Sequence, residues 1–249
     1  MSDDLPEWLG TLSKASETVE PEQLSRFVPP QEPSVRDSAV LILMADDGDH
    51  PDVLLTERAW TLRSHAGQMS FPGGRVDSAD GEGDQAIVNA ALREAQEETG
   101  LDPSGVQVFA VWPALWVPVS NFAVSPVLAW WREPSPVAVV DPAEVASVHR
   151  VELAALADPR NRVMCAYPSG FSGPAFVPDG LFIWGFTALL LERLLQLGGW
   201  AREWDTSRIV PLPDKMAQAA WRDRSRLDQA EQRLLKTIEH DLARPDDEA

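Results

Sequence analysis

The chain has 249 residues, 44% of them hydrophobic, which is enough for one sizeable core, and we expect one domain with terminal extensions. Its 39 acidic and 21 basic side chains give a net charge of −18, so repulsion excludes an extended nucleic-acid backbone as a partner. A small phosphate-bearing molecule stays compatible with this charge, provided that arginines, backbone amides or metal ions reverse the field locally.

Residues 1–35 are rich in Pro, Ser and Glu and predict an N-terminal extension with a short helix around Leu5 to Leu12. The first residues lack the basic and apolar regions of a secretory signal. No apolar run approaches the roughly 18 residues of a membrane-spanning helix. Cys165 is the single cysteine. Since it can form no internal disulfide, we expect a cytoplasmic protein in which Cys165 is buried in a strand and unreactive.

Two short apolar runs, Ala39–Met44 and Val53–Thr56, open the compact part of the chain. The turn-forming segment DDGDHPD separates them, so together they predict a β-hairpin. Ser70–Val76 then contains a Pro-Gly-Gly break. It leads into an acidic, glycine-containing loop over Asp77–Asp84.

A long helix is predicted from Asp84 to Thr99, with Asp84 as its N-cap and Gly100 as its C-terminal stop. Further strands are predicted at Val106–Val111, Val124–Trp131 and Arg162–Tyr167, and near Phe182. An amphipathic helix over Trp184–Leu197 ends at Gly198-Gly199. Because strands and helices do not alternate regularly, the pattern favours an α+β sandwich in which helices cover a mixed sheet.

The tail over 214–249 is charged and has a helical pattern with a thin apolar stripe, formed by Leu227, Leu234, Leu235 and Ile238. We expect it to pack on the domain or on a partner subunit, which leaves a homodimer open. His149 and His240 stand in charged segments of helical appearance and are expected to be solvated. The predicted organisation is an extension over 1–35, a domain over 36–213 and a helical tail over 214–249.

Three glutamates of the predicted long helix indicate a chemical site. Glu94, Glu97 and Glu98 stand at i, i+3 and i+4, so their carboxylates project from one face and repel one another. A divalent cation between them would remove the repulsion, since hard oxygen ligands suit Mg²⁺. A solvated surface helix is the ordinary alternative. Against it, Glu94 and Glu98 continue an apolar seam with Ile87 and Ala91, where unpaired carboxylates are costly to bury.

Arg93 directly precedes these glutamates and offers a charge-assisted partner, and Gly73-Gly74 forms a bend whose carbonyl could reach the same metal. Together, Gly73-Gly74 and the segment REAQEETG resemble the Nudix box. The resemblance implies an α/β/α sandwich that hydrolyses a nucleoside diphosphate linked to another group, with Mg²⁺ or Mn²⁺. It further implies that Glu94 and Glu98 ligate the metal, that Glu97 is a further ligand or the base acting on water, and that Arg93 orients the carboxylates.

The N-terminal half of the box departs from the family pattern. Gln85 and Ala79 stand where the family has Glu and Gly, and the glycine bend lies further upstream than usual. The loop is therefore longer, and one acidic ligand is missing or is replaced by Asp80 or Asp84. This departure keeps open the alternative of an inactive Nudix-fold module that only binds nucleotides.

A second block over Leu54–Gly74 is similar to the signature of the coenzyme A branch of this family, in which Leu-Leu-Thr, an Arg, a Leu and His-x-Gly-Gln lead into Phe-Pro-Gly-Gly. The resemblance implies that coenzyme A or an acyl derivative is cleaved to 3′,5′-ADP and 4′-phosphopantetheine. Arg58, Arg63 and His65 would gather positive or potentially positive groups for its phosphates, with Gly73 and Gly74 alongside. Alternatively, both arginines are surface charges and His65 caps a turn. A nucleotide sugar, NADH or a dinucleoside polyphosphate are the alternative substrates.

Overall fold

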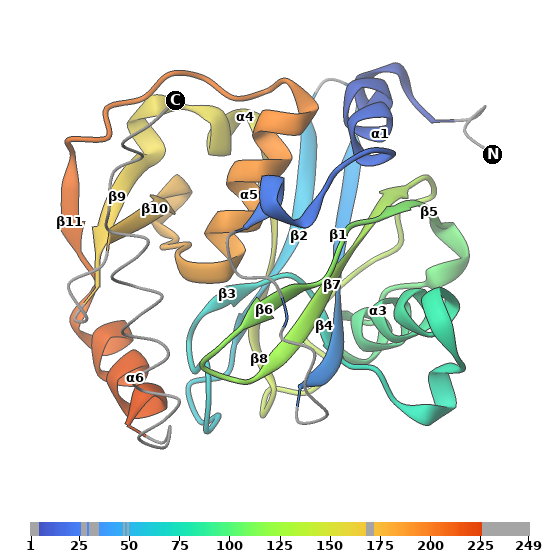
Figure 1. Ribbon diagram of the computed structural model, residues 1–249, viewed down its shortest axis with the longest axis horizontal. Coiled ribbons are helices and arrows are strands. Elements are labelled where there is room, and N and C mark those ends of the chain that lie inside the picture. Colours follow the sequence, from blue (N-terminus) through green and yellow to red (C-terminus); the bar gives the residue numbers. More distant parts are fainter. Residues whose placement is uncertain are drawn as a thin grey trace.

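The computed structural model describes residues 5–25, 29, 35–46, 48, 50–167 and 172–225, and within them the chain is built on an eight-stranded mixed sheet (Figure 1). Its central strand β1 (Arg36–Asp46) runs parallel to β7 (Phe122–Trp131) and antiparallel to β2 (Pro51–Arg58). The strand path is β3-β2-β1-β7-β5, with β4 added on β1, β6 on β7 and β8 on β2. The remaining strands of this sheet are β3 (Met69–Ser70), β4 (Gly73–Arg75), β5 (Val106–Val111), β6 (Leu115–Val117) and β8 (Val145–Glu152).

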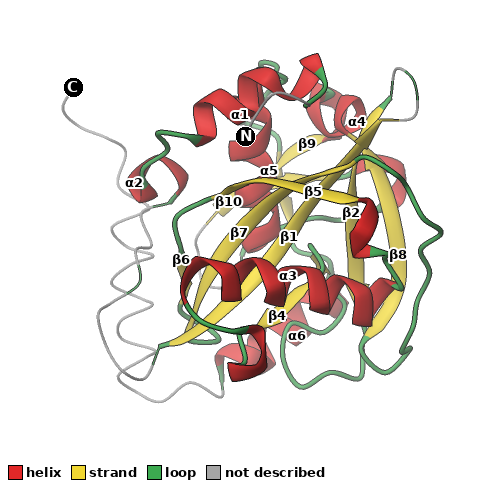
Figure 2. Cartoon of the chain, turned by 90° about the vertical axis from the view of Figure 1, so that its right-hand side faces the viewer, coloured by secondary structure: helices red, strands yellow, loops and turns green. Residues whose placement is uncertain are grey.

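Helices cover both faces of this sheet, so the predicted α/β/α arrangement is confirmed (Figure 2). The long helix α3 (Gly83–Thr99) packs on one face, and α1 (Gly10–Ser16) and α5 (Gly185–Gly198) pack together over the other. Because neighbouring side chains of a strand point to opposite faces, Leu41 of β1 packs in the core under α3 and Ile42 in the core under α5.

A smaller sheet with the order β10-β9-β11 lies beside the main one in the described chain (Figure 1). Its core contains the fully buried Cys165, and α6 (Asp214–Arg224) packs against it. Burial raises the pKa of the Cys165 thiol to about 11, so this cysteine is buried and unreactive as predicted. The three strands are β9 (Arg162–Ala166), β10 (Ser172–Phe176) and β11 (Ile209–Pro211). Short helices complete the described chain: η1 (Glu7–Leu9), α2 (Pro21–Leu24), η2 (Ser78–Asp80), η3 (Pro103–Gly105), α4 (Leu153–Ala157), η4 (Pro159–Asn161) and η5 (Pro178–Gly180).

The N-terminal segment contributes to the main core. Leu9, Leu12 and Leu24 are each 0% exposed and belong to the cluster under α5. The Trp112 indole N–H donates a hydrogen bond to the Ser16 hydroxyl over 2.9 Å, which ties α1 to the sheet. The short helix predicted around Leu5 to Leu12 is therefore present, but it begins at Glu7 as η1 and continues as α1 to Ser16. The boundaries of the extension, domain and tail stay a prediction.

Most of the predicted elements lie where the sequence places them. The β1–β2 hairpin, β5, β7, β9 and α5 are confirmed, and Gly100 ends α3 in the left-handed conformation. The predicted N-cap at Asp84 was wrong. The extended backbone that an N-cap needs occurs at Glu82, and Asp84 lies within the first helical turn. Within the described residues, no helix is both long and apolar enough to cross a lipid bilayer.

The segment around His149 was misassigned, because it forms strand β8 and not a helix. Valines recur every third residue at Val145, Val148 and Val151, which imitates a helical period. The pairing of β8 with β2 contains a register shift, so the strict alternation of a strand is lost at this point. His240 and the apolar stripe of the tail lie outside the described residues.

No strand forms at Phe182 in the described part of the chain. The neighbouring Ile183 makes an isolated β-bridge with Phe176, and this pairing does not extend to further residues. The next residues enter α5, so the chain turns away from β10 immediately after this bridge.

Truncating a buried leucine of α1 tests whether the N-terminal helices belong to the fold. We expect Leu12→Ala to lower the free energy of unfolding by about 3 kcal/mol, because the side chain is fully buried and leaves a cavity. Chemical denaturation of the full chain measures this change. The matched control is Lys14→Ala on the exposed side of the same helix, and equal stability of the two variants would contradict the assignment.

Candidate active site

The glycine bend and the acidic end of α3 are in direct contact. Gly73 and Gly74 are the first two residues of β4, which pairs with β1 and packs against α3. A Cβ atom on Gly74 would stand 2.3 Å from the Cδ atom of Glu94, so the absent side chain makes room for this carboxylate. The backbone N–H of Gly73 donates a hydrogen bond to Oε2 of Glu98 over 3.3 Å. The structure thus brings both proposed metal-binding glutamates to the bend.

The Gly74 carbonyl is already engaged. Its oxygen accepts a hydrogen bond from the Ser38 hydroxyl over 2.5 Å. A carbonyl oxygen has a second lone pair, so this contact narrows the directions from which a metal ion could approach without closing the site.

Glu98 is the most deeply buried carboxylate of the three. Its residue is 6% exposed, and burial raises its pKa to about 7, with the charges of Glu94 and Glu144 acting in the same direction. The positive charge of Arg58 and the Gly73 N–H oppose this rise in pKa. At neutral pH, a carboxyl group with such a pKa is present in both its neutral and its charged form. A cation beside it would stabilise the charged form.

Glu94 and Glu97 lie progressively closer to solvent. Burial also raises the pKa of Glu94, although its hydrogen bond with Arg93 counteracts the effect. The Glu97 side chain is 58% exposed. The predicted apolar seam is therefore confirmed on one side of α3, where Ala91 is fully buried and Glu98 nearly so, and Glu97 stands at its edge.

Arg93 joins four groups around the helix. Its Nε and Nη2 atoms bind the two carboxylate oxygens of Asp80 over 2.8 and 3.0 Å. Its Nη1 atom donates to Oε1 of Glu94 over 2.8 Å and to Oε2 of Glu97 over 3.3 Å. Its Nη2 atom also reaches the carbonyl of Arg75 over 3.0 Å. A guanidinium held at this many points can hold the neighbouring carboxylates in fixed directions.

Of the two acidic residues considered in place of Gln85, only Asp80 reaches the site. Asp80 is 5% exposed, and its hydrogen bond with Arg93 lowers its pKa. Both of its carboxylate oxygens accept hydrogen bonds from Arg93, so Asp80 holds the side chain of that arginine in place. Asp84 is exposed in the first turn of α3, and the Gln85 amide donates to Asn89 on the exposed side of the helix.

Arg58 is the predicted positive group whose charge acts on Glu98. Its Nε atom is buried and has no hydrogen-bond partner among the described residues. His65 lies close by, and burial followed by the charge of Arg58 lowers its pKa. The imidazole is therefore mainly neutral at pH 7, and its Nδ1 atom lies 3.2 Å from the side-chain oxygen of Gln68. Arg63 is exposed in the same loop.

Glu144 belongs to the site, and the sequence offered no signal for it. The segment before β8 packs on the end of α3, where the Val140 N–H donates to the Glu98 carbonyl over 3.3 Å. The Glu144 carbonyl accepts from the Ala59 N–H over 2.8 Å. The Glu144 charge raises the pKa of both Glu94 and Glu98, so the exposed Glu144 is a fourth carboxylate whose charge acts on the site from outside α3.

The donor atoms at this site suit a divalent cation. Within the described ranges, no three His, Cys, Asp or Glu side chains converge as they would around a bound ion. Arg93 instead holds Glu94 and Glu97, and Gly73 holds Glu98. The residues fit such an ion by their chemistry, because carboxylate oxygens are the ligands that Mg²⁺ and Mn²⁺ prefer. The space at Gly74 accommodates one of these carboxylates, that of Glu94.

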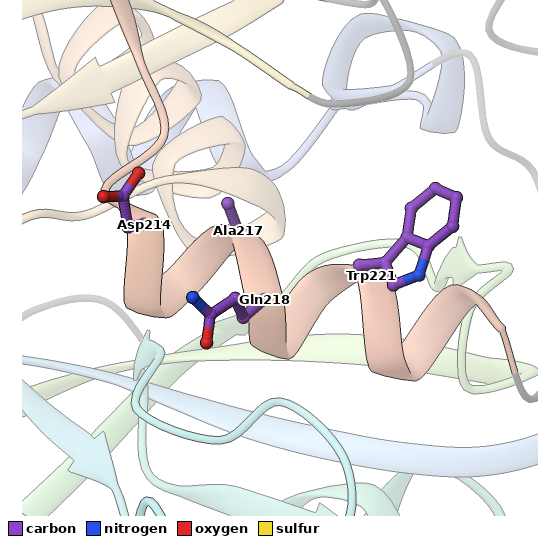
Figure 3. A pocket seen from close by; sticks show the side chains of 4 residues that line it. All are labelled: Asp214, Ala217, Gln218 and Trp221. Atoms are coloured by element: carbon purple, nitrogen blue, oxygen red, sulfur yellow. The ribbon is translucent and has the colours of Figure 1, made fainter.

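A surface pocket of about 370 Å³ lies elsewhere, on α6 (Figure 3). It is lined by Asp214, Ala217, Gln218 and Trp221 and shares no residue with the carboxylate site. Because these four residues come from one flank of one helix, the pocket does not define an active site.

Comparisons with known proteins agree on one family. A family model described as the NUDIX domain matches residues 35–166, more than half of the chain. Two curated proteins, from Salmonella paratyphi B and Salmonella newport, are both named "Uncharacterized Nudix hydrolase NudL". Each is 40% identical to this chain over 173 residues, which cover 66% of this chain and 83% of the relative.

Solved structures of similar proteins include the Nudix hydrolase RenU from M. smegmatis. It shares 21% identity, covers 72% of this chain and 98% of its own, and has a TM-score of 0.48. The NUDIX domain of Shewanella oneidensis NrtR, solved in complex with ADP ribose, shares 19% identity. That match covers 55% of this chain and 85% of the NrtR chain, with a TM-score of 0.39.

Alanine at each of the two glycines should separate function from folding. We expect Gly74→Ala to lower hydrolase activity at least about tenfold with little change in melting temperature, because its Cβ displaces only the flexible Glu94 side chain. Gly73→Ala should lower the free energy of unfolding by about 1–3 kcal/mol, because its Cβ would stand 2.3 Å from the Ala39 carbonyl oxygen. Activity assays and thermal melts of both variants test this pair, and an active Gly74→Ala enzyme would contradict the role of Glu94.

The raised pKa of Glu98 should appear in the pH dependence of stability. Its folded-state pKa of about 7 exceeds the ordinary value of 4.5, so folding favours the protonated form. This stabilising contribution is complete below pH 4.5 and is lost as the pH rises through 7. In the metal-free protein, the free energy of unfolding should therefore fall with rising pH more steeply in the wild type than in Glu98→Gln. Parallel curves for the two proteins would refute the assignment.

Proposed function

This chain belongs to the Nudix hydrolase family, and from that premise we propose that it cleaves the diphosphate bond of coenzyme A or of its acyl derivatives. The products would be 3′,5′-ADP and 4′-phosphopantetheine, free or acylated. Nudix hydrolases act on nucleoside diphosphate derivatives and generally use divalent metal ions such as Mg²⁺. The finer choice of substrate, and of Mg²⁺ or Mn²⁺, is our proposal.

The main support for a metal-dependent hydrolysis at this site is the contact of Glu94 and Glu98 with the Gly73-Gly74 bend. We assign both glutamates to the metal ions and Glu97 to a further ligand or to the base that takes a proton from water. A bound divalent ion supplies charge neutralisation for the diphosphate and lowers the pKa of the attacking water. Arg93 contributes by keeping the Glu94 and Glu97 carboxylates in place.

Glu144 extends this assignment. It comes from a different segment, before β8, and its charge acts on both Glu94 and Glu98. We propose that it supplies the acidic group that the Nudix box of this chain lacks at Gln85. Asp80 is the weaker choice for that role, because Arg93 binds both of its carboxylate oxygens.

Support for coenzyme A as the substrate comes from the sequence motif over residues 54–74 and from the position of this segment next to the carboxylates. Its Arg58 lies beside Glu98, and the buried Nε atom of Arg58 lacks a hydrogen-bond partner within the described chain. An unmatched guanidinium N–H in a buried position is costly, and a phosphate oxygen would satisfy it. We assign Arg58, Arg63 and His65 to substrate binding, together with the backbone of Gly73 and Gly74.

The decisive experiment incubates the purified chain with coenzyme A and Mg²⁺ or Mn²⁺ and measures 3′,5′-ADP by chromatography. A parallel panel contains acyl-coenzyme A, a nucleotide sugar, NADH and a dinucleoside polyphosphate. We expect the highest kcat/KM for coenzyme A or an acyl form. Faster cleavage of another panel member would replace our substrate with that one. Saturable thermal stabilisation by coenzyme A without product would indicate a binding module.

Within that assay, Glu98→Gln should lower kcat at least about 100-fold at saturating Mg²⁺, because it keeps the shape of the side chain and removes the ligand charge. Glu82→Gln is the matched control, since Glu82 is exposed at the opposite end of the same helix. An undiminished rate in Glu98→Gln would contradict the metal site.

A further inference from the structure

We propose that helix α6 is part of the substrate-binding structure and that Asp223 is a positioning residue for the loop over residues 59–68, here called the substrate loop. The proposal rests on the proposed function, because this loop contains Arg63 and His65, which are assigned to substrate binding. α6 lies outside residues 35–166, to which the family model is matched, so the family resemblance assigns it no role.

The first contact is a charge-assisted hydrogen bond. The backbone N–H of His65 donates to Oδ2 of Asp223 over 2.8 Å, and Asp223 is only 5% exposed. His65 has a φ of 56°, a left-handed conformation that residues other than glycine adopt rarely. The Asp223 carboxylate therefore holds the loop at a backbone position that is intrinsically unfavourable.

The second contact involves Trp60 at the start of the loop. The Lys215 ammonium nitrogen of α6 lies 3.5 Å from the centre of the indole ring, in a cation–π arrangement. The indole N–H donates to Glu57 over 3.0 Å. A Cβ on Gly67 would stand 2.3 Å from the ring, so the Trp60 ring packs directly on the far end of the same loop. α6 thus touches the loop both at His65 and at Trp60.

These contacts come from one face of α6. Lys215, Ala219 and Asp223 are spaced four residues apart, and both Ala219 and Asp223 are buried. The residues that line the pocket in Figure 3 lie on a different flank of the helix. The orientation of α6 is therefore specific, with one face committed to the substrate loop.

The second oxygen of Asp223 argues for more than packing. Its Oδ1 atom is buried and accepts no hydrogen bond from the described residues. A buried carboxylate with an unmatched oxygen opposes stability, and a smaller apolar residue would pack a helix at lower cost. The carboxylate at this position fits a role in fixing the loop that carries His65 and leads from Arg58 back to the glycine bend.

The test uses the full chain and compares Asp223→Ala, Asp223→Asn and Asp214→Asn. Asp223→Ala removes the acceptor, Asp223→Asn keeps an acceptor without the charge, and Asp214→Asn makes the same charge change on the other flank of α6. With coenzyme A and saturating Mg²⁺, we expect Asp223→Ala to raise KM about tenfold with kcat changed less than about twofold. Asp223→Asn should raise KM less, and Asp214→Asn should leave KM unchanged.

A direct readout is the His65 backbone amide in ¹H–¹⁵N spectra. Its proton should move upfield and exchange faster with solvent in Asp223→Ala, and neither property should change in Asp214→Asn. Lys215→Ala and Lys215→Arg form a second pair at an exposed position, which keeps the proposal testable if Asp223→Ala fails to fold. Lys215→Ala should raise KM, and Lys215→Arg should restore it because arginine also stacks on the indole.

The outcomes separate this inference from the function on which it rests. A wild-type chain that cleaves no diphosphate substrate would refute the proposed function. An active wild type whose Asp223 and Lys215 variants keep the wild-type KM would refute only the role of α6. A change of kcat without a change of KM would also overturn it, because a displaced binding loop should first weaken substrate binding.

Discussion

The candidate site depends on the close approach of α3 to a strand that has no side chains at the point of contact. Only glycine at position 74 leaves space for the Glu94 carboxylate, and the Gly73 backbone meets Glu98 directly. Carboxylates pressed against backbone in this way lose water, which raises the pKa of Glu94 and Glu98. The proposed assignment of Glu94 and Glu98 to the metal ions follows from that desolvated contact.

The two arginines near these carboxylates differ in how many of their N–H groups are already hydrogen-bonded. Arg93 is shared among three of them and a carbonyl, so it organises the site and has little left to offer a ligand. Arg58 is the opposite case, with a buried Nε atom that no described residue satisfies. His65 adds a mainly neutral ring, because burial and Arg58 lower its pKa. In a chain of net charge −18, the local reversal of charge therefore relies on few groups.

The sequence predicted what local pattern controls. The spacing of Glu94 and Glu98 with buried neighbours identified the helix face, and turn residues located the hairpin and the glycine bend. It could not predict the parts that Glu144 and Asp223 play, because the Glu144 backbone meets Ala59 and the Asp223 carboxylate meets His65 through contacts between distant segments. Strand β8 was missed since an irregular register breaks its alternation. The choice between Asp80 and Asp84 likewise needed the fold, which places only Asp80 against Arg93.

One face of the main sheet is covered by helices that lie outside the family-matched segment. That segment ends at Ala166, the last residue of β9, whereas α1 precedes it and α5 follows it. A fragment cut at those limits would expose the apolar face of the main sheet that α1 and α5 cover, and it would tend to self-associate. The segment that the family model matches is thus shorter than the part of the chain that buries both faces of the sheet. The flanking sequence serves as an intramolecular partner that any transplanted module would have to carry with it.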